Sequence, residues 1–128
     1  MQIEHVALET AQLEKLREFY QRYFAASASQ LYHNPKTGLK TYFLSFQNAS
    51  RLELMSWPES TAPVEKTVRC GPHHLAFYLD GKEKVDGLTL QLQQDGCRVV
   101  SPPRVTGDGY YESCILDPDG NRIELVTE

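Results

Sequence analysis

The sequence lacks the features that would place the protein in a membrane or on a nucleic acid. No apolar stretch is long enough to cross a bilayer, and Glu4 stands near the N-terminus where a secretory signal would need an apolar run. Lys and Arg form no run, and the formal net charge is -4, so a surface that neutralises phosphates is not evident. These absences predict a cytoplasmic protein that has neither a nucleic-acid partner nor a membrane partner.

Cysteine is scarce as well, which argues against a disulfide framework and against a cysteine-based zinc site. The three cysteines, Cys70, Cys97 and Cys114, lie far apart and match no zinc-binding spacing. We expect reduced thiols that serve as small buried apolar residues. With 41% hydrophobic and 23% charged residues in a chain of 128, the composition is typical of one globular domain.

The first half of the chain predicts the element order β-α-β-β-β. The segment 3–8 alternates as a strand, and Thr10 can cap a helix that ends at Phe24. The apolar positions of this helix are expected on one face: Leu13, Leu16, Tyr20 and Tyr23. Three β-favouring segments follow, 30–33, 39–46 and 51–56, with a turn at 34–38 between the first two.

The second half predicts the same order. A strand at 74–79 precedes a helix at 80–94, which Asp80 can cap with Glu83 three residues later. Val85, Leu88 and Leu92 form the apolar stripe of this helix, and Gly96 stops it. Strands are expected at 97–100, 110–116 and 122–126, the last two joined by a tight turn at 117–120.

A polar segment with three prolines, residues 57–72, separates the two halves and is the best linker candidate. The domain organisation predicted from this pattern is one domain over residues 1–128. Its first module covers residues 1–56, and its second module covers residues 73–128.

The two halves also share local sequence. His5-Val6-Ala7-Leu8 matches His74-Leu75-Ala76-Phe77, and Arg51-Leu52-Glu53-Leu54 matches Arg122-Ile123-Glu124-Leu125. The matched pieces are 69 and 71 residues apart, so they occupy equivalent places in the two modules.

These repeated segments carry the residues that indicate a metal site. Side chains alternate faces along a strand, so each His and each Glu points away from its apolar neighbours. Two imidazoles and two carboxylates suit a divalent zinc, nickel, cobalt, manganese or iron ion and leave positions open for substrate. The predicted ligands are His5, Glu53, His74 and Glu124. His73 competes with His74, but the repeat register favours His74 and leaves His73 and His33 as ordinary polar residues.

The segments IEHVAL, RLELM, GPHHLAFYL and LDPDGNRIELV resemble the vicinal oxygen chelate superfamily, which includes glyoxalase I, bleomycin resistance proteins and extradiol dioxygenases. The resemblance covers essentially the whole chain, and its most specific piece is the closing LDPDGNRIEL. It implies an α+β fold in which two βαβββ modules form a cupped mixed sheet around a metal site, commonly in a homodimer.

Within that superfamily the four predicted ligands resemble the His, Glu, His, Glu set of glyoxalase I. The resemblance implies a metal-dependent lyase or isomerase that acts on a small oxygen-bearing substrate through metal-stabilised enediolate-like chemistry. A metal-bound carboxylate would move the proton. By its position in the second module Glu124 is the expected base, and Glu53 is the less favoured choice.

The chain departs from bacterial glyoxalase I at two positions that contact glutathione. That family has an Arg four residues after the first His and an Asn four residues after the first Glu, whereas this chain has Glu9 and Trp57. An acid at the place of the Arg would repel a carboxylate, which argues against the glutathione adduct of methylglyoxal as substrate.

Other branches of the superfamily fit the residues less well. Fosfomycin resistance enzymes carry a Thr where this chain has Ala7, and extradiol dioxygenases leave the position of Glu53 without a ligand. A non-catalytic protein that sequesters a small molecule in the same cup is the alternative function. Side chains proposed to line the cup in either case are Tyr42, Met55, Tyr78, Tyr110 and Tyr111.

Overall fold

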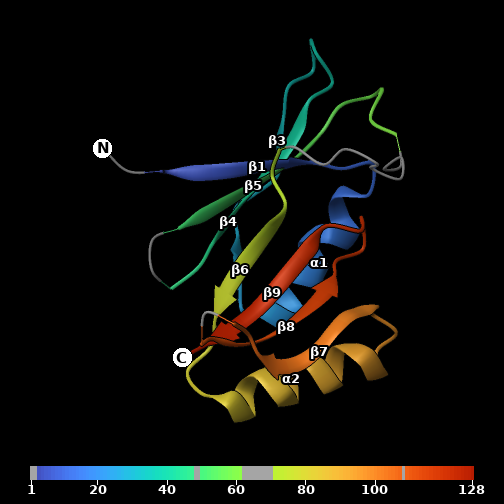
Figure 1. Ribbon diagram of the computed structural model, residues 1–128. Coiled ribbons are helices and arrows are strands. Elements are labelled where there is room, and N and C mark those ends of the chain that lie inside the picture. Colours follow the sequence, from blue (N-terminus) through green and yellow to red (C-terminus); the bar gives the residue numbers. More distant parts are fainter. Residues whose placement is uncertain (1–2, 48–49, 62–70, 108) are drawn as a thin grey trace. The chain divides into compact units, whose positions relative to one another are not determined.

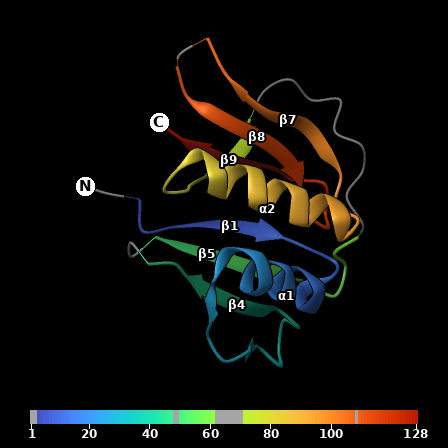
Figure 2. The ribbon, with the colours of Figure 1, turned by 90° about the horizontal axis from the view of Figure 1, so that it is seen from below.

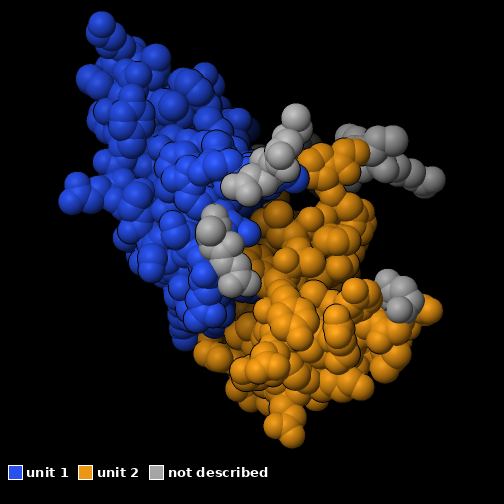
Figure 3. Space-filling model, turned by 90° about the vertical axis from the view of Figure 1, so that its left-hand side faces the viewer, with its two compact units in different colours: residues 1–65 blue, residues 66–128 orange. Residues whose placement is uncertain are grey.

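The computed structural model describes residues 3–47, 50–61, 71–107 and 109–128, which fold into two compact units (Figure 1). Unit 1 comprises residues 1–65 and unit 2 residues 66–128, and Figure 3 shows them in blue and orange. Each unit contains one helix and its own sheet, so the predicted α+β class and two-module arrangement are confirmed. Residues 62–70, most of the predicted linker and Cys70, lie outside the described part. No helix among the described residues is long and apolar enough to span a bilayer.

The sheet of unit 1 brings the strand that carries His5 beside the strand that carries Glu53. Strand β1 (His5–Glu9) runs parallel to β5 (Arg51–Ser56), with Ala7 opposite Glu53. Antiparallel to β5 lies β4 (Lys40–Ser45), which also pairs with two short strands, β2 (Ser27–Ala28) and β3 (Tyr32–His33). Strand β1 thus lies at one edge of this sheet.

The sheet of unit 2 repeats this arrangement with β6 (His74–Tyr78) parallel to β9 (Arg122–Thr127) and Ala76 opposite Glu124. Beyond β9 come β8 (Tyr111–Leu116) and β7 (Val99–Val105), both antiparallel to their neighbours. Strand β6 is therefore at the edge of its sheet, as β1 is in unit 1. The repeat predicted from the sequence extends to strand direction and register.

One helix covers one face of each sheet. Helix α1 (Leu13–Phe24) packs on β4 and β5, and α2 (Lys82–Gln94) packs on β7, β8 and β9 (Figure 2). The burial of apolar side chains beneath the helices contributes about 1.5–3 kcal/mol for each large aliphatic group. The fully buried apolar residues of the two cores are Leu16, Tyr20, Leu44 and Leu54 in unit 1, and Val85, Leu92, Ile115, Ile123 and Leu125 in unit 2.

Both predicted helix caps are wrong. Helix α1 begins three residues after Thr10, whose hydroxyl accepts a 2.9 Å hydrogen bond from the Gln12 N–H instead of capping the helix. The Thr10 N–H donates to the carbonyl of Met55, which extends the pairing of β1 with β5 by one residue beyond Glu9. At α2 the N-cap residue is Gly81, with φ of 108°, and Asp80 makes no capping hydrogen bond.

The predicted apolar stripes of both helices are confirmed except at one position each. Phe19 is buried in α1, whereas Tyr23 is only half-buried. In α2 the buried position is Thr89 rather than Leu88, and its hydroxyl donates to the Val85 carbonyl at 2.6 Å. A threonine can occupy this site because the backbone of its own helix satisfies the hydroxyl.

Two strand predictions are also corrected. Of the predicted strand 30–33, only Tyr32 and His33 form a strand, which is β3. A second short strand, β2, lies before it at Ser27–Ala28. Strand β7 runs to Val105 through Pro102 and Pro103, where the prediction ended at Val100. Proline is tolerated there because β7 is an edge strand, and its pairing with β8 shifts register before Ser101 and again between Ser101 and Arg104, the interval that contains both prolines.

Candidate functional site

In unit 1 the structure brings His5 and Glu53 together. His5 is opposite Arg51 in the parallel register, so Glu53 lies two residues beyond that position on β5. The side chains of His5 and Glu53 share the face opposite to Leu52 and Leu54. The His5 Nε2 atom is 3.6 Å from a carboxylate oxygen of Glu53, and the side chains are 38% and 18% exposed. The pair is therefore close-packed on the sheet and open to solvent.

In unit 2 His74 and Glu124 form the equivalent pair. Their strands have the same parallel register, and the His74 Nε2 atom lies 3.2 Å from a carboxylate oxygen of Glu124. The exposed fractions, 37% and 20%, nearly equal those of the first pair. His74, and not His73, faces the carboxylate, in agreement with the repeat register.

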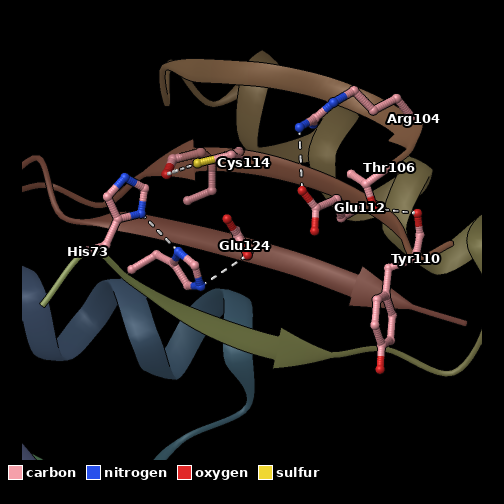
Figure 4. Close-up of polar contacts among 9 residues, drawn as sticks. His73, Arg104, Thr106, Tyr110, Glu112, Cys114 and Glu124 are labelled. Atoms are coloured by element: carbon pink, nitrogen blue, oxygen red, sulfur yellow. Dashed lines mark hydrogen bonds and ion pairs between the residues drawn. The ribbon is translucent and has the colours of Figure 1, made fainter. Parts of the chain in front are cut away.

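The Nδ1 atom of each histidine meets the side chain of the preceding residue. His5 Nδ1 is hydrogen-bonded to Glu4, whose carboxylate also pairs with Arg51. The hydrogen bond from His5 and the guanidinium of Arg51 together lower the pKa of Glu4. In unit 2 the corresponding neighbour is His73, whose Nδ1 lies 3.0 Å from that of His74 (Figure 4). Both histidines therefore present Nε2 to the glutamate.

The donor geometry fits a metal ion. Two ligands that each lie about 2.0–2.2 Å from one ion, at tetrahedral or octahedral angles, are separated by roughly 3.0–3.5 Å. The measured separations of 3.6 Å and 3.2 Å are close to that range. In the described ranges no third His, Cys, Asp or Glu joins either pair to make a metal-binding group. Each pair therefore offers two candidate ligands within its own unit.

The two pairs differ in what lies beside the glutamate on the adjacent antiparallel strand. Glu53 is opposite Phe43, whose ring stacks edge-on with His5 at 5.3 Å and lies under the guanidinium of Arg51. Glu124 is opposite Cys114, a buried thiol whose pKa is raised by burial. The smaller side chain leaves more room next to Glu124 than next to Glu53.

Beyond Cys114 the same face of unit 2 carries an ion pair. Glu112 and Arg104 lie opposite each other on β8 and β7, and their side chains are 3.4 Å apart. Figure 4 shows the carboxylates of Glu112 and Glu124 on one side of this sheet, with Cys114 near them. A substrate group that reached Arg104 would meet a cation already held by Glu112.

Two of the five side chains proposed to line the cup face the helices instead. The Tyr42 hydroxyl donates to Glu14 of α1 at 2.8 Å, and the Tyr111 hydroxyl donates to Asp86 of α2 at 2.7 Å. These hydrogen bonds are the first cause of a raised pKa at both tyrosines. Strand alternation puts Met55 on the same face of its sheet as Glu53, and Tyr78 on the same face as His74. Tyr110 lies just before β8.

Glu4, Arg104 and Glu112 were not predicted from the sequence. Glu4 could have been found from the repeat, because it precedes His5 as His73 precedes His74. No such signal exists for Arg104, since β7 was predicted to end before the two prolines. Glu112 was inside a predicted strand, but its partner was not.

The chain is similar to known proteins in both sequence and fold. Residues 2–125 match the family model of the Glyoxalase/Bleomycin resistance protein/Dioxygenase superfamily. The chain is 29% identical over 129 residues to the protein YqjT of Bacillus subtilis, covering 95% of each chain. It is 23% identical over 112 residues to the mitochondrial methylmalonyl-CoA epimerase of Dictyostelium discoideum, covering 84% of this chain and 65% of that one. The solved structure of a possible glyoxalase from Bacillus cereus superposes with a TM-score of 0.73 at 27% identity, with 99% of both chains covered.

Proposed function

Since the chain belongs to the Glyoxalase/Bleomycin resistance protein/Dioxygenase superfamily, we propose that it is a metal-dependent lyase or isomerase of the glyoxalase type. The observation that carries this proposal is the repeated pair of His Nε2 and Glu carboxylate, at 3.6 Å in unit 1 and 3.2 Å in unit 2. We propose that both pairs donate to one divalent metal ion. The donor set suits zinc, nickel, cobalt, manganese or iron.

Each residue of the two pairs would have its own role in metal binding or proton transfer. When bound, a divalent metal supplies a Lewis acid that makes the C–H beside a substrate carbonyl more acidic. His5 and His74 would hold the metal through Nε2, with Glu4 and His73 fixing the orientation of the rings at Nδ1. Glu124 would take the proton from that carbon and return it to the substrate, because its neighbour on β8 is the small side chain of Cys114. Glu53 would act chiefly as a ligand beside the wall that Phe43 forms.

The substrate class that fits is a small molecule with a carbonyl or hydroxyl next to an acidic C–H. One relative is an epimerase by name, and the solved neighbour from Bacillus cereus is a possible glyoxalase. Glutathione adducts fit poorly, because Glu9 stands where an arginine would pair with a carboxylate. We propose a cytoplasmic homodimer, as is common for two-module members of the superfamily.

The test is metal content measured together with stability. The purified wild-type protein should retain metal in elemental analysis, and its melting temperature should rise by about 10 °C when zinc, nickel, cobalt or manganese is added at about 100 times the dissociation constant. His5→Ala, Glu53→Ala and His74→Ala should each lower metal content, while His33→Ala, outside the pairs, should leave it unchanged. Equal metal content in all variants would exclude the proposed site.

A protein that sequesters a small molecule without turnover is the second candidate. It is favoured by one observation, that among the described residues neither pair is joined by a third candidate metal ligand. A wild-type protein that retains no metal and shows no metal-dependent melting would support this function in place of the enzyme.

A further inference from the structure

Unit 1 contains a pocket that includes none of the four proposed ligands. Its volume is about 310 Å³, and it lies at the end of the sheet where β3, β4 and the segment after β5 meet. Its lining residues are His33, Gly38, Lys40, Ser56, Trp57 and Pro58. Lys40 and Ser56 are opposite each other in the β4–β5 register, on the face away from Glu53. This pocket is thus separate from the His5–Glu53 pair.

The backbone fixes the walls of this pocket. The side-chain oxygen of Asn34 accepts hydrogen bonds from the N–H groups of Lys36 and Thr37, which closes the turn before β4. Gly38 ends that turn with φ of 77°, and a Cβ atom there would come within 2.4 Å of the Pro58 ring. The turn and the segment after β5 are therefore in direct contact, and only glycine permits it.

A second turn holds Trp57. The Ser60 hydroxyl oxygen accepts a 2.8 Å hydrogen bond from the Trp57 N–H, and the Ser60 N–H donates to the Trp57 carbonyl. The half-buried indole consequently stands on a closed turn next to the pocket. A rigid aromatic wall of this kind loses little conformational freedom when a ligand binds.

The charge and polarity of the side chains that line the pocket favour a planar anion as the ligand. Lys40 and His33 are cross-strand neighbours, and within the described part of the chain neither forms an ion pair with a carboxylate. No acidic residue lines the pocket. A cation and the hydroxyl of Ser56 can hold a carboxylate, and the indole offers a flat apolar surface to a ring. The volume is at the lower end of small-molecule pockets, about 300–1,000 Å³, which limits the ligand to a single ring system.

We infer that this pocket binds a small aromatic carboxylate, with the carboxylate on Lys40 and Ser56 and the ring against Trp57. This site is additional to the proposed metal chemistry and does not depend on it. A ligand of this size is expected to bind with a dissociation constant on the order of 1 mM or tighter.

Trp57 is the only tryptophan in the chain, so its fluorescence reports on the pocket that it lines. Benzoate titrated into the whole protein should change that fluorescence saturably. Benzamide, which has the ring without the charge, and cyclohexanecarboxylate, which has the charge without the aromatic ring, should each bind about tenfold more weakly. Equal binding of benzoate and benzamide would overturn the inference, as would the absence of a saturable change.

Variants at two lysines complete the test. Lys40→Met should weaken benzoate binding about tenfold, and Lys40→Arg should retain it, which separates loss of the cation from loss of the fold. Lys36→Met is the matched control, since Lys36 is an exposed residue of the neighbouring turn that does not line the pocket. Unchanged binding in Lys40→Met would refute the site. Metal content measured on the same variants should equal that of the wild type, whether or not the proposed metal site exists.

Discussion

Glu9 accepts a 2.8 Å hydrogen bond from the hydroxyl of Ser60, a residue 51 positions later in the chain. The same hydroxyl oxygen accepts the N–H of Trp57. The two positions at which this chain departs from glyoxalase I, Glu9 and Trp57, are therefore joined through one serine. Glu9 is an element of a local hydrogen-bond network and is not an isolated replacement of an arginine.

We expect no significant turnover of the hemithioacetal of methylglyoxal and glutathione. The carboxylate of Glu9 would face a carboxylate of glutathione and repel it, and the indole of Trp57 occupies the place of a hydrogen-bonding amide. The measurement is a spectrophotometric assay of S-lactoylglutathione formation with metal-loaded protein. Turnover near the usual enzyme range, about 1 to 1,000 per second, would contradict this reading of Glu9 and Trp57.

Ser60→Ala should loosen the turn that carries Trp57. The variant loses the hydrogen bonds to Glu9 and from the Trp57 N–H, and at about 0.5–1.5 kcal/mol for each bond the free energy of unfolding should fall by roughly 1–2 kcal/mol. The near-ultraviolet circular dichroism of the single tryptophan should weaken at the same time. Ser29→Ala, which also removes a hydroxyl bonded to the backbone of unit 1, is the control and should leave that signal intact.

The four proposed ligands could be picked out from the sequence because strand alternation and the internal repeat are both visible there. Strand alternation decides the face of Glu53 and Glu124, and the repeat decides which histidine corresponds to His5. The parallel pairing that brings each His beside its Glu joins β1 to β5 and β6 to β9, strands that are separated in the chain by a helix and by further strands, and it was not predicted.

The helix starts could not be predicted in the same way. Thr10 and Asp80 have the side chains of good capping residues, but their place is decided by the strands that precede them. Thr10 is held by its N–H bond to Met55, a residue of β5 that a local pattern cannot foresee. The faces of Tyr42 and Tyr111 were misjudged for a related reason, because their acidic partners on the helices lie 28 and 25 residues away.

Glu124→Gln should retain the fold and abolish proton transfer. An amide cannot take up the proton, and it donates less charge to a metal, so metal affinity should also fall. Glu53→Gln should weaken metal binding to a similar extent but leave measurable exchange when metal is supplied in excess. The measurement is exchange of the substrate C–H in deuterated water, followed by NMR with each variant saturated in metal. Equal exchange rates in the two variants would contradict the assignment of Glu124 as the base.

Glu4→Gln should lower metal affinity about tenfold although Glu4 is not a proposed ligand. Its carboxylate is hydrogen-bonded to the Nδ1 atom of His5, and losing such a partner typically costs 10- to 100-fold in affinity. Competition with a chromophoric chelator would measure the change. Glu59→Gln, at an exposed residue of the same unit, is the matched control and should bind metal as the wild type does. An unchanged affinity in Glu4→Gln would mean that His5 does not need this partner.

Tyr42→Phe should destabilise unit 1 by about 1 kcal/mol at pH 7 and by less at high pH. The Tyr42 hydroxyl donates to Glu14, and this hydrogen bond raises the pKa of the phenol because it holds the protonated form. A raised pKa in the folded state means that the stabilisation is complete below the ordinary tyrosine pKa of about 10 and is lost as the pH rises through the higher folded value. Urea unfolding of wild type and variant at pH 7 and at pH about 10.5 measures the difference. Tyr32→Phe, at an exposed tyrosine of the same unit, should change neither value. A destabilisation that grew with pH would show that the Tyr42 hydroxyl does not donate a hydrogen bond to Glu14.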